Sequence, residues 1–381
     1  MRKKICFITA VPGTAKSFLS DHINALRKDY DVYYVSNEPD ASKVDVPFDG
    51  YYCADIHRGI SLINDLKGVF QLYRIFKKEH FDAVHSVTPK AGLLTAIAGW
   101  RAGIKYRIHI FTGQVWATRK GFMRWLLKLM DKVIARLDNH ILVDGKSQCT
   151  FLESEGVLKK GQATVFGEGS ISGVNTHRFV PNEGLRKEVR QDFGIEDNTL
   201  VFLFMGRLNH DKGIGELYAA YDRLAAESKD VFLLLVGTDE ENYISKLPQY
   251  PNINSSNFFY YGATPTPEKV LNAGDVFVLP TYREGFGTSV LEAACIGLPS
   301  ITSDAYGVLD ASVEGETGLR CKVGDIDSLY DCMRYFYEDR NMVKLMGEKS
   351  RARVLRDFSG ERLTEFWEDF YHSLLALPNV S

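Results

Sequence analysis

The sequence predicts two doubly wound α/β domains in tandem. Short apolar runs alternate with segments of helical spacing in two successive sets, and strands that alternate with helices build parallel sheets. The 381 residues suffice for two domains of roughly 100–200 residues each. Ligands of such sheets bind beyond the carboxyl ends of the strands. Two facing domains would therefore form a cleft that binds substrates.

The first set of elements lies before residue 145 and the second begins at residue 199. A stretch rich in Gly, Asn and Pro, residues 169–198, is predicted to join them. The strands expected in the first set are residues 4–10, 31–35, 83–86, 106–111 and 140–143, with helices over 18–28, 66–79 and 90–101. Those of the second set are residues 201–208, 231–238, 258–262, 276–281 and 299–303, each followed by a helix.

An amphipathic stretch ends the chain. Its apolar residues recur at helical spacing, so it is expected to close the second domain or to cross back onto the first. The predicted divisions are residues 1–180 for the first domain, 181–358 for the second domain and 359–381 for this helix.

Composition excludes several classes of protein. The longest apolar stretches fall well short of the roughly 20 residues of a membrane-spanning helix, and the apolar N-terminal run is stopped by Pro12 and Gly13 without a cleavage site, which favours a buried strand over a signal peptide. The six cysteines form no C-x-x-C pair. We therefore expect a reducing compartment, the cytoplasm, and neither a zinc nor a redox site.

Charge is distributed unevenly. Residues 1–180 contain 26 Lys and Arg against 17 Asp and Glu, a balance of +9, and the remainder contains 20 against 32, a balance of −12. Two differently solvated surfaces would explain this, as would a basic half that meets an anionic partner. The basic half has no motif that reads nucleic acid, so nucleic-acid binding is not expected.

The strongest motif runs from Tyr282 to Asp304, after a buried strand. Gly285 and Gly287 form a tight loop and a helix follows, which presents free N–H groups and a positive dipole end to an anion. Glu284 and Glu292 suit sugar and ribose hydroxyls, since ionised carboxylates are acceptors only. A capped helix with two surface glutamates is the structural alternative.

A second motif follows the first strand of the second set. Arg207 and Lys212 come directly after that strand's carboxyl end, between Gly206 and Gly213. Two cations there can neutralise a diphosphate, Arg as a bidentate fork and Lys as a point charge. A solvated loop is again the alternative. The acidic run from Asp239 to Glu241 follows a later strand, and we interpret it as a solvated turn.

Together these motifs resemble those of the family 4 retaining glycosyltransferases of the GT-B fold, with their Gly-Arg…Lys-Gly turn and Glu-x7-Glu motif. The flanking segments NAGDVFVLP and GVLDASVEGETGLRCKVGD fit as well, and GSISGVNTHRFVP resembles the family's domain junction. The resemblance covers most of the chain and is closest in the second domain. It implies that residues 1–180 are an acceptor-binding domain and residues 181–358 a donor-binding domain.

The resemblance implies a donor site without a metal ion or other cofactor, where cations and a helix end balance the charge. Arg207, Lys212 and Glu284 would be the catalytic residues, with Arg207 and Lys212 on the donor diphosphate, Glu284 on the transferred sugar and Glu292 on the ribose. The remaining donor-binding residues would be Gly13, Gly206, Gly262, Gly285, Phe286, Gly287, Thr288, Ser289 and Val290.

The first domain departs from the family pattern, with Pro12-Gly13-Thr14 where many relatives have two glycines. His85 and His109 are candidates for the acceptor site, although a core role suits both, since they lie in or at the ends of strands. The loop Thr112, Gly113 and Gln114 is the other candidate. The segments HSVTPKAG and FTGQVW resemble enzymes of bacterial capsule and O-antigen synthesis, which implies a lipid-linked glycan acceptor.

The segment from Arg119 to Leu137 is basic and amphipathic. Such a helix can lie in the membrane interface or pack on a sheet with its basic side in solvent. The first reading would place the protein peripherally on the cytoplasmic membrane face.

The expected activity is transfer of a sugar from a nucleoside diphosphate, most simply a UDP-hexose or UDP-N-acetylhexosamine, with retention. A sugar-nucleotide epimerase or a phosphorylase of the same architecture, and a non-catalytic sugar-binding protein, are the alternatives.

Overall fold

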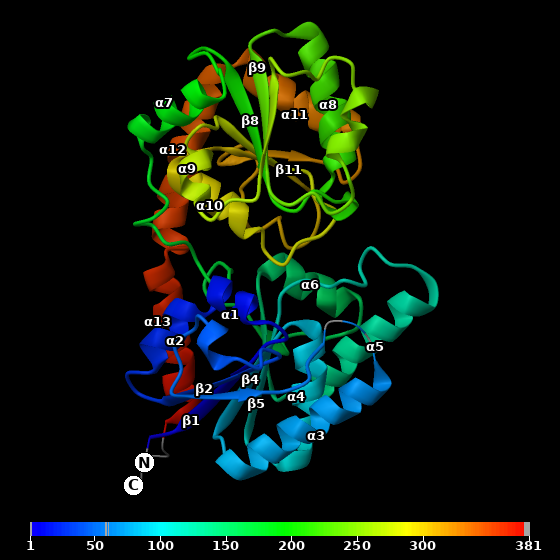
Figure 1. The fold of residues 1–381 in the computed structure, drawn as a ribbon, viewed down its shortest axis with the longest axis vertical. Coiled ribbons are helices and arrows are strands. Elements are labelled where there is room, and N and C mark those ends of the chain that lie inside the picture. The colour runs from blue at the N-terminus through cyan, green and yellow to red at the C-terminus, as the bar shows by residue number, and fades with distance from the viewer. Residues whose placement is uncertain (1, 58, 60, 377–381) are drawn as a thin grey trace. The chain divides into compact units, whose positions relative to one another are not determined.

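The computed structural model describes residues 2–57, 59 and 61–376. The chain divides into two compact units, and Figure 1 shows each as a sheet with helices around it. The first unit is Met1–Gly173 together with Gly360–Ser381, and the second is Val174–Ser359.

The first unit contains a parallel sheet of seven strands in the order β3-β2-β1-β4-β5-β6-β7. Alternate residues of β1 serve opposite faces: Ile5 and Phe7 join the core under α2 and α13, whereas Cys6 and Ile8 join the core under α3 and α4. Its strands are β1 (Lys4–Ile8), β2 (Asp31–Ser36), β3 (Gly50–Cys53), β4 (Ala83–Val87), β5 (Tyr106–Phe111), β6 (His140–Val143) and β7 (Ala163–Thr164). Its helices are α1 (Pro12–Phe18), α2 (Ser20–Leu26), α3 (Leu62–Glu79), α4 (Pro89–Ala102), α5 (Gly121–Leu137), α6 (Lys146–Ser154) and α13 (Gly360–Leu375), with a 3-10 turn, Ala41–Lys43.

The second unit contains a parallel sheet of six strands in the order β10-β9-β8-β11-β12-β13. Strands β9 and β11 are buried along their whole length, as their unbroken apolar runs predict. Its strands are β8 (Leu200–Met205), β9 (Val231–Val236), β10 (Phe258–Gly262), β11 (Val276–Leu279), β12 (Ser300–Ser303) and β13 (Gly318–Cys321). Its helices are α7 (Glu183–Asp192), α8 (Ile214–Glu227), α9 (Pro267–Leu271), α10 (Thr288–Ile296), α11 (Ile326–Glu338) and α12 (Arg340–Asp357), with 3-10 turns η2 (His210–Lys212) and η3 (Ile244–Gln249).

The doubly wound architecture is confirmed, and several element predictions need correction. Strands β3, β7 and β13 were not expected, and all three lie at or next to a sheet edge, where short strands carry little apolar signal. The helix predicted over 18–28 is replaced by α1 and α2, which meet at Leu19. A 3-10 turn, η3, stands after β9 where a helix was expected.

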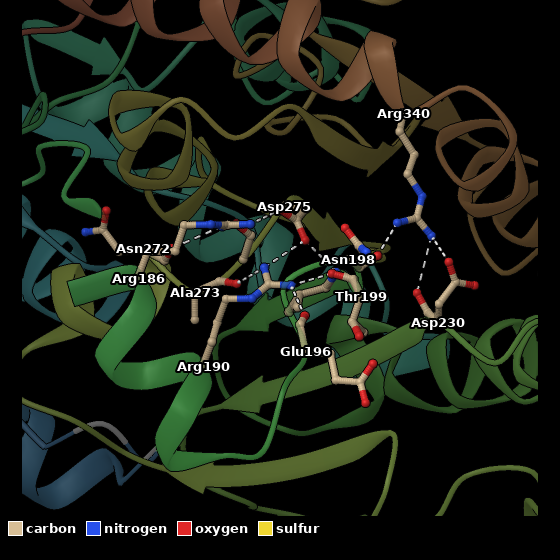
Figure 2. Close-up of polar contacts among 12 residues, drawn as sticks. Arg186, Arg190, Glu196, Asn198, Thr199, Asp230, Asn272, Ala273, Asp275 and Arg340 are labelled. Atoms are coloured by element: carbon tan, nitrogen blue, oxygen red, sulfur yellow. Dashed lines mark hydrogen bonds and ion pairs between the residues drawn. The ribbon is translucent and has the colours of Figure 1, made fainter. Parts of the chain in front are cut away.

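The predicted junction contains a helix, α7. Asn182 caps it by accepting a hydrogen bond from the Leu185 N–H at 3.0 Å. Figure 2 shows Arg186 and Arg190 of this helix directed at Asp275, with ion pairs of 2.5 Å and 3.2 Å. Asp275 also accepts a hydrogen bond from the Val201 N–H at the start of β8. These contacts bind α7 to the amino edge of the second sheet.

The boundary predicted after residue 180 is placed too late. The Val174 N–H donates to the Phe358 carbonyl at 2.8 Å, and Phe179 lies in the second core, so residues 174–180 belong to the second unit. At the other end, α13 packs in the first unit through Leu363, Trp367 and Tyr371, which are all fully buried. The sequence left two placements open for this helix. In the structure the helix crosses back onto the first unit and does not close the second.

Candidate active site

The two sequence motifs meet in the second unit. Strands β8 and β11 are neighbours in the sheet although β9 and β10 separate them in the chain, so the order of the strands reverses between them. A ligand site is expected in the crevice beyond such a reversal. The loop after β8 contains Arg207 and Lys212, and the loop after β11 contains Glu284.

Asp211 joins these loops. Its backbone carbonyl accepts hydrogen bonds from the Tyr282 N–H and the Thr281 hydroxyl, each at 2.8 Å, and its carboxylate forms an ion pair with Arg283 at 2.7 Å. The Tyr282 hydroxyl donates to Glu216 of α8 at 2.6 Å. The two loops are therefore held as one surface.

Lys212 and Glu284 form an ion pair across this surface. Their side chains are only 15% and 16% exposed, so the pair is largely removed from water. A partly buried ammonium has few hydration partners to lose when an anion approaches, and its attraction to that anion is strengthened by the lower local dielectric. The pair therefore presents a preorganised cation and a hydroxyl acceptor side by side.

Helix α10 begins directly after the Glu284 loop. Its N-cap is Gly287, which makes no side-chain capping hydrogen bond, so the first N–H groups of Thr288 and Ser289 are left for a ligand. Phe286 is buried and its ring packs 5.5 Å from that of Phe358. Gly285 and Val290 complete the loop and first turn named in the sequence.

Glu292 lies one turn into α10 and is partly buried. It forms no hydrogen bond or ion pair with any of the residues that the structure describes. Burial raises the pKa of Glu292 to about 7, an effect that the neighbouring positive charge of Arg178 opposes. Because no described residue occupies its oxygens, Glu292 can accept hydrogen bonds from a ligand, and does so as an acceptor-only carboxylate once it is ionised.

Arg207 is oriented differently from Lys212. Its side chain is 59% exposed and forms an ion pair with Glu240 at 3.2 Å, and the same carboxylate accepts a hydrogen bond from Asn209 at 2.8 Å. The acidic run 239–241 is a turn in which Glu240 and Glu241 are exposed, as interpreted from the sequence. Asp239 accepts backbone hydrogen bonds from Tyr243 and Ile244, whereas Glu240 and Glu241 contact the loop after β8 through Arg207 and the His210 N–H.

Two glycines allow the loops to approach each other closely. Gly213 has a φ of +70°, and a Cβ there would lie 2.1 Å from the Pro280 carbonyl oxygen. Gly307 has a φ of +84°, and its Cβ would lie 2.2 Å from the Glu284 carbonyl oxygen. Of the other predicted glycines, Gly206 directly follows β8 and Gly262 ends β10, where its carbonyl accepts a hydrogen bond from the Gly237 N–H.

We expect Gly213→Ala to destabilise the second unit by about 3 kcal/mol or more, because both the left-handed backbone and the collision with Pro280 oppose a side chain. Gly297→Ala is the matched control: its φ is +97° but nothing lies within 4 Å of the added Cβ. Urea unfolding of both variants checks this prediction. Equal losses in the two would mean that backbone strain alone accounts for the effect.

The candidates in the first unit are more scattered. Gly13 lies in the first turn of α1, exposed, with open space around it. Thr112 and Gly113 follow β5 and are partly exposed, whereas Gln114 is buried and accepts a hydrogen bond from Gln148 at 3.3 Å.

His85 and His109 are core residues. The His85 Nδ1 lies 2.8 Å from the Tyr371 hydroxyl, and its ring stacks on Trp367. His109 Nδ1 lies 2.8 Å from the Ser86 hydroxyl. Burial lowers the pKa of His85 well below its usual range and that of His109 to about 3. Both side chains are at most 1% exposed, so neither is placed to touch an acceptor.

The sequence interpretation missed Asp211, Glu216 and Glu240. All three are acidic residues near the motifs, but their partners lie between 33 and 72 positions away in the chain. These contacts follow from the order of β8, β9 and β11 in the sheet, which sequence motifs do not report.

Comparison with known proteins supports these assignments of fold and class. Residues 186–353 match the family model described as glycosyl transferases group 1, and residues 4–136 match that described as glycosyl transferase 4-like. The chain is 30% identical to the capsular polysaccharide biosynthesis glycosyltransferase CapM of Staphylococcus aureus, over 92% of this chain and 91% of that protein.

A second relative is an Escherichia coli UDP-Gal:alpha-D-GlcNAc-diphosphoundecaprenol alpha-1,3-galactosyltransferase, 26% identical over 98% of this chain and 97% of its own. Among solved structures, Anabaena Alr3699/HepE in complex with UDP and glucose superposes with a TM-score of 0.80 at 18% identity, covering 98% of this chain and all of that one. At that identity the likeness concerns the fold, which is GT-B. The chain is thus a glycosyltransferase, a member of the group 1 (family 4-type) glycosyltransferases with the GT-B fold.

Proposed function

We propose that this glycosyltransferase moves a hexose or N-acetylhexosamine from a UDP-sugar to a hydroxyl of a lipid-linked glycan, with retention of configuration and without a metal ion, in the synthesis of a bacterial surface polysaccharide. The observation that carries the proposal is the partly buried Lys212–Glu284 pair beside the uncapped start of α10. The UDP and glucose named for the HepE complex and the lipid diphosphate named for the E. coli relative support the substrate classes.

In this proposal Lys212 and Arg207 neutralise the donor diphosphate together with the N–H groups of Thr288 and Ser289. Negative charge grows on the leaving phosphate oxygen in the transition state, and positioned cations and dipoles stabilise it there without reorganisation. These groups supply the role that a divalent cation has in other transferases, so no metal is required.

The carboxylates bind the rest of the donor. Glu284 accepts hydrogen bonds from hydroxyls of the transferred sugar, and Glu292 accepts them from the ribose. Backbone groups from Phe286 to Val290, with Gly206, Gly262, Gly285 and Gly287 beside them, let the main chain approach the donor closely.

Transfer then proceeds on one face of the sugar. The bond between the anomeric carbon and the phosphate oxygen breaks, the acceptor oxygen forms its bond on the same face, and the acceptor proton passes to the leaving phosphate. For binding of the acceptor, the partly exposed Thr112 and Gly113 of the first unit are the remaining candidates, because both histidines lie in the core.

We further propose that the protein works in the cytoplasm at the membrane face, with α5 lying in the interface. Among the described residues, no helix is long and apolar enough to cross a bilayer. The N-terminal turn of α5 carries exposed Phe122 and Trp125 beside exposed Arg119 and Lys120, a combination that suits an anionic lipid surface.

A donor panel tests the proposed activity. The protein is incubated with UDP-, GDP- and ADP-sugars, with and without polyprenyl-diphosphate-linked sugars, and nucleotide release and the anomer formed are followed by NMR in the presence of EDTA. We expect acceptor-dependent UDP release and retained configuration. Turnover without acceptor would indicate an epimerase or hydrolytic enzyme, and loss of activity with EDTA would contradict metal independence.

The affinity for the nucleotide sugar should increase by up to about tenfold from pH 6 to pH 8, because Glu292, whose pKa is about 7, goes from about one tenth to about nine tenths acceptor-only carboxylate over this range. Calorimetry with an intact nucleotide sugar measures this without the phosphate titration of free UDP. Glu292→Gln should remove the slope while the protein still binds. The same slope in the variant would mean that another group titrates.

A further inference from the structure

Exposed apolar side chains are concentrated on one part of the first unit. Of the sixteen large apolar side chains that are exposed in the described part of the chain, nine lie on α3, α4 and α5. Isolated exposed apolar residues are ordinary, whereas a contiguous group marks an interaction surface. This group therefore indicates a surface that binds a partner.

The most exposed of these nine apolar side chains lie on helix α3. Leu62, Leu66 and Phe70 recur every four residues and so form a stripe along one side of the helix, and Ile63 adjoins it. Their exposed fractions run from 58% to 82%. The opposite side of α3 packs in the core through Leu72 and Phe76, so the stripe is not needed to hold the helix to the sheet.

Helix α4 lies between α3 and α5 (Figure 1). An open groove of about 370 Å³ runs between α3 and α4, lined chiefly by Leu66, Phe70, Ile97 and Trp100, with Arg101 at its side. On α5, the rings of Phe122 and Trp125 stack at 5.6 Å and are both exposed, as are Met123 and Leu129. The stripe of α3, the groove and the exposed residues of α5 are called the apolar shelf below.

The helices of the shelf carry an excess of positive charge, although Lys67 pairs with Asp55, and Arg124 and Lys128 pair with Glu155. Residues 61–137 contain 14 Lys and Arg but only 4 Asp and Glu, and each of the four acids has a partner: Asp65 pairs with Lys90, Glu79 with Lys4 and Asp82 with Lys3, and Asp131 accepts from Trp116. Arg101, Arg119 and Lys120 are exposed and form no ion pair with any residue that the structure describes. An anionic surface would complement this face.

The position of the shelf relative to the sheet follows from the topology. In a parallel sheet each helix begins where the preceding strand ends. The exposed residues of α3 lie at positions 62–70 of 62–79, and those of α5 at 122–129 of 121–137. Both groups therefore lie toward the carboxyl edge of the first sheet, the edge at which such sheets bind ligands.

We infer that the apolar shelf is a bilayer-docking surface, in which the exposed side chains of α3 and α5, on either side of α4, insert into an anionic phospholipid interface and the groove at Trp100 accepts lipid chain. Docking in this way would bring the carboxyl edge of the first sheet to the membrane surface, where a lipid-linked acceptor is presented. The inference extends the proposed interfacial role of α5 and rests on that proposal for the choice of partner.

Vesicle flotation tests α3 directly. The full chain is mixed with vesicles of phosphatidylcholine alone or with phosphatidylglycerol, and Ile63→Gln/Leu66→Gln is compared with Leu345→Gln/Leu355→Gln. The control pair is also exposed and apolar but lies on α12 of the second unit, and glutamine keeps helix propensity. We expect the α3 variant to bind anionic vesicles about tenfold more weakly or worse and the α12 variant to bind as the parent does.

Tryptophan fluorescence separates α4 from α5. The chain has four tryptophans, of which Trp100 and Trp125 are exposed and Trp116 and Trp367 buried. Brominated lipids should quench part of the emission of the parent protein, and Trp100→Phe and Trp125→Phe should each remove part of that quenching. Quenching that disappears entirely in Trp125→Phe would overturn the assignment of α3 and α4.

Two other outcomes would also overturn the inference: equal binding of the α3 variant and its control, or a dimer in light scattering that the α3 variant dissociates while neither protein binds vesicles. These measurements need no sugar donor. Vesicle binding that persists in a protein inactive toward every UDP-sugar would contradict the proposed reaction and leave the docking surface in place.

Discussion

Lys212→Ala should lower kcat/KM for sugar transfer by roughly 10²- to 10³-fold, the loss that removal of one preorganised charge donor costs at a developing anion. The Lys212 side chain is largely buried and its partner is Glu284. The substitution therefore removes the cation from the leaving group and also leaves a partly buried carboxylate without its counter-charge. Both effects oppose the approach of a diphosphate, so donor affinity should fall as well as kcat.

Lys269→Ala is the control for this prediction. Lys269 lies in the same unit and also forms an ion pair, with Glu188 at 2.7 Å, but it is more exposed and lies on α9. Its replacement should leave kcat/KM within about twofold, because exposed pairs contribute little. A Lys212→Ala enzyme that matches the Lys269→Ala enzyme in steady-state assays would remove Lys212 from the donor site.

Trp367→Ala should destabilise the first unit by about 3–5 kcal/mol, the usual cost of deleting a buried aromatic side chain. Trp367 is fully buried, stacks between His22 and His85 at centroid distances of 5.4 Å and 5.1 Å, and donates a hydrogen bond to the Ile171 carbonyl at 2.9 Å. The variant therefore loses apolar contact and leaves a buried carbonyl without a donor.

Denaturant unfolding with and without UDP measures this loss. UDP that binds the second unit stabilises that unit against unfolding by mass action, so the unfolding transition that UDP does not shift belongs to the first unit. We expect the midpoint of this transition to fall in Trp367→Ala. Trp125→Ala, on the exposed side of α5, is the matched control and should change the free energy of unfolding by less than about 0.5 kcal/mol. A loss below about 1 kcal/mol in Trp367→Ala would contradict the packing of α13 described above.

Some parts of the fold and the donor motif depend on local sequence. Uninterrupted apolar runs such as Val231–Val236 can be accommodated only in the interior, so the central strands were predictable. The same holds for the loops at Lys212 and Glu284. Each follows a central strand, and glycines and a helix start mark each loop whatever its surroundings.

The tertiary structure decided which of these groups meet and which groups are buried. Lys212 and Glu284 lie 72 positions apart, and His85 and Tyr371 lie 286 apart. No periodicity reports such pairs, because they depend on the order of strands in a sheet and on the path of the last helix. For that reason the core positions of both histidines, the contact of Glu240 with Arg207, and the return of α13 to the first unit were not determined by the sequence alone. The sequence did determine two parallel sheets and a charged donor motif, because the burial of a strand and the geometry of a loop depend on residues that are neighbours in the chain.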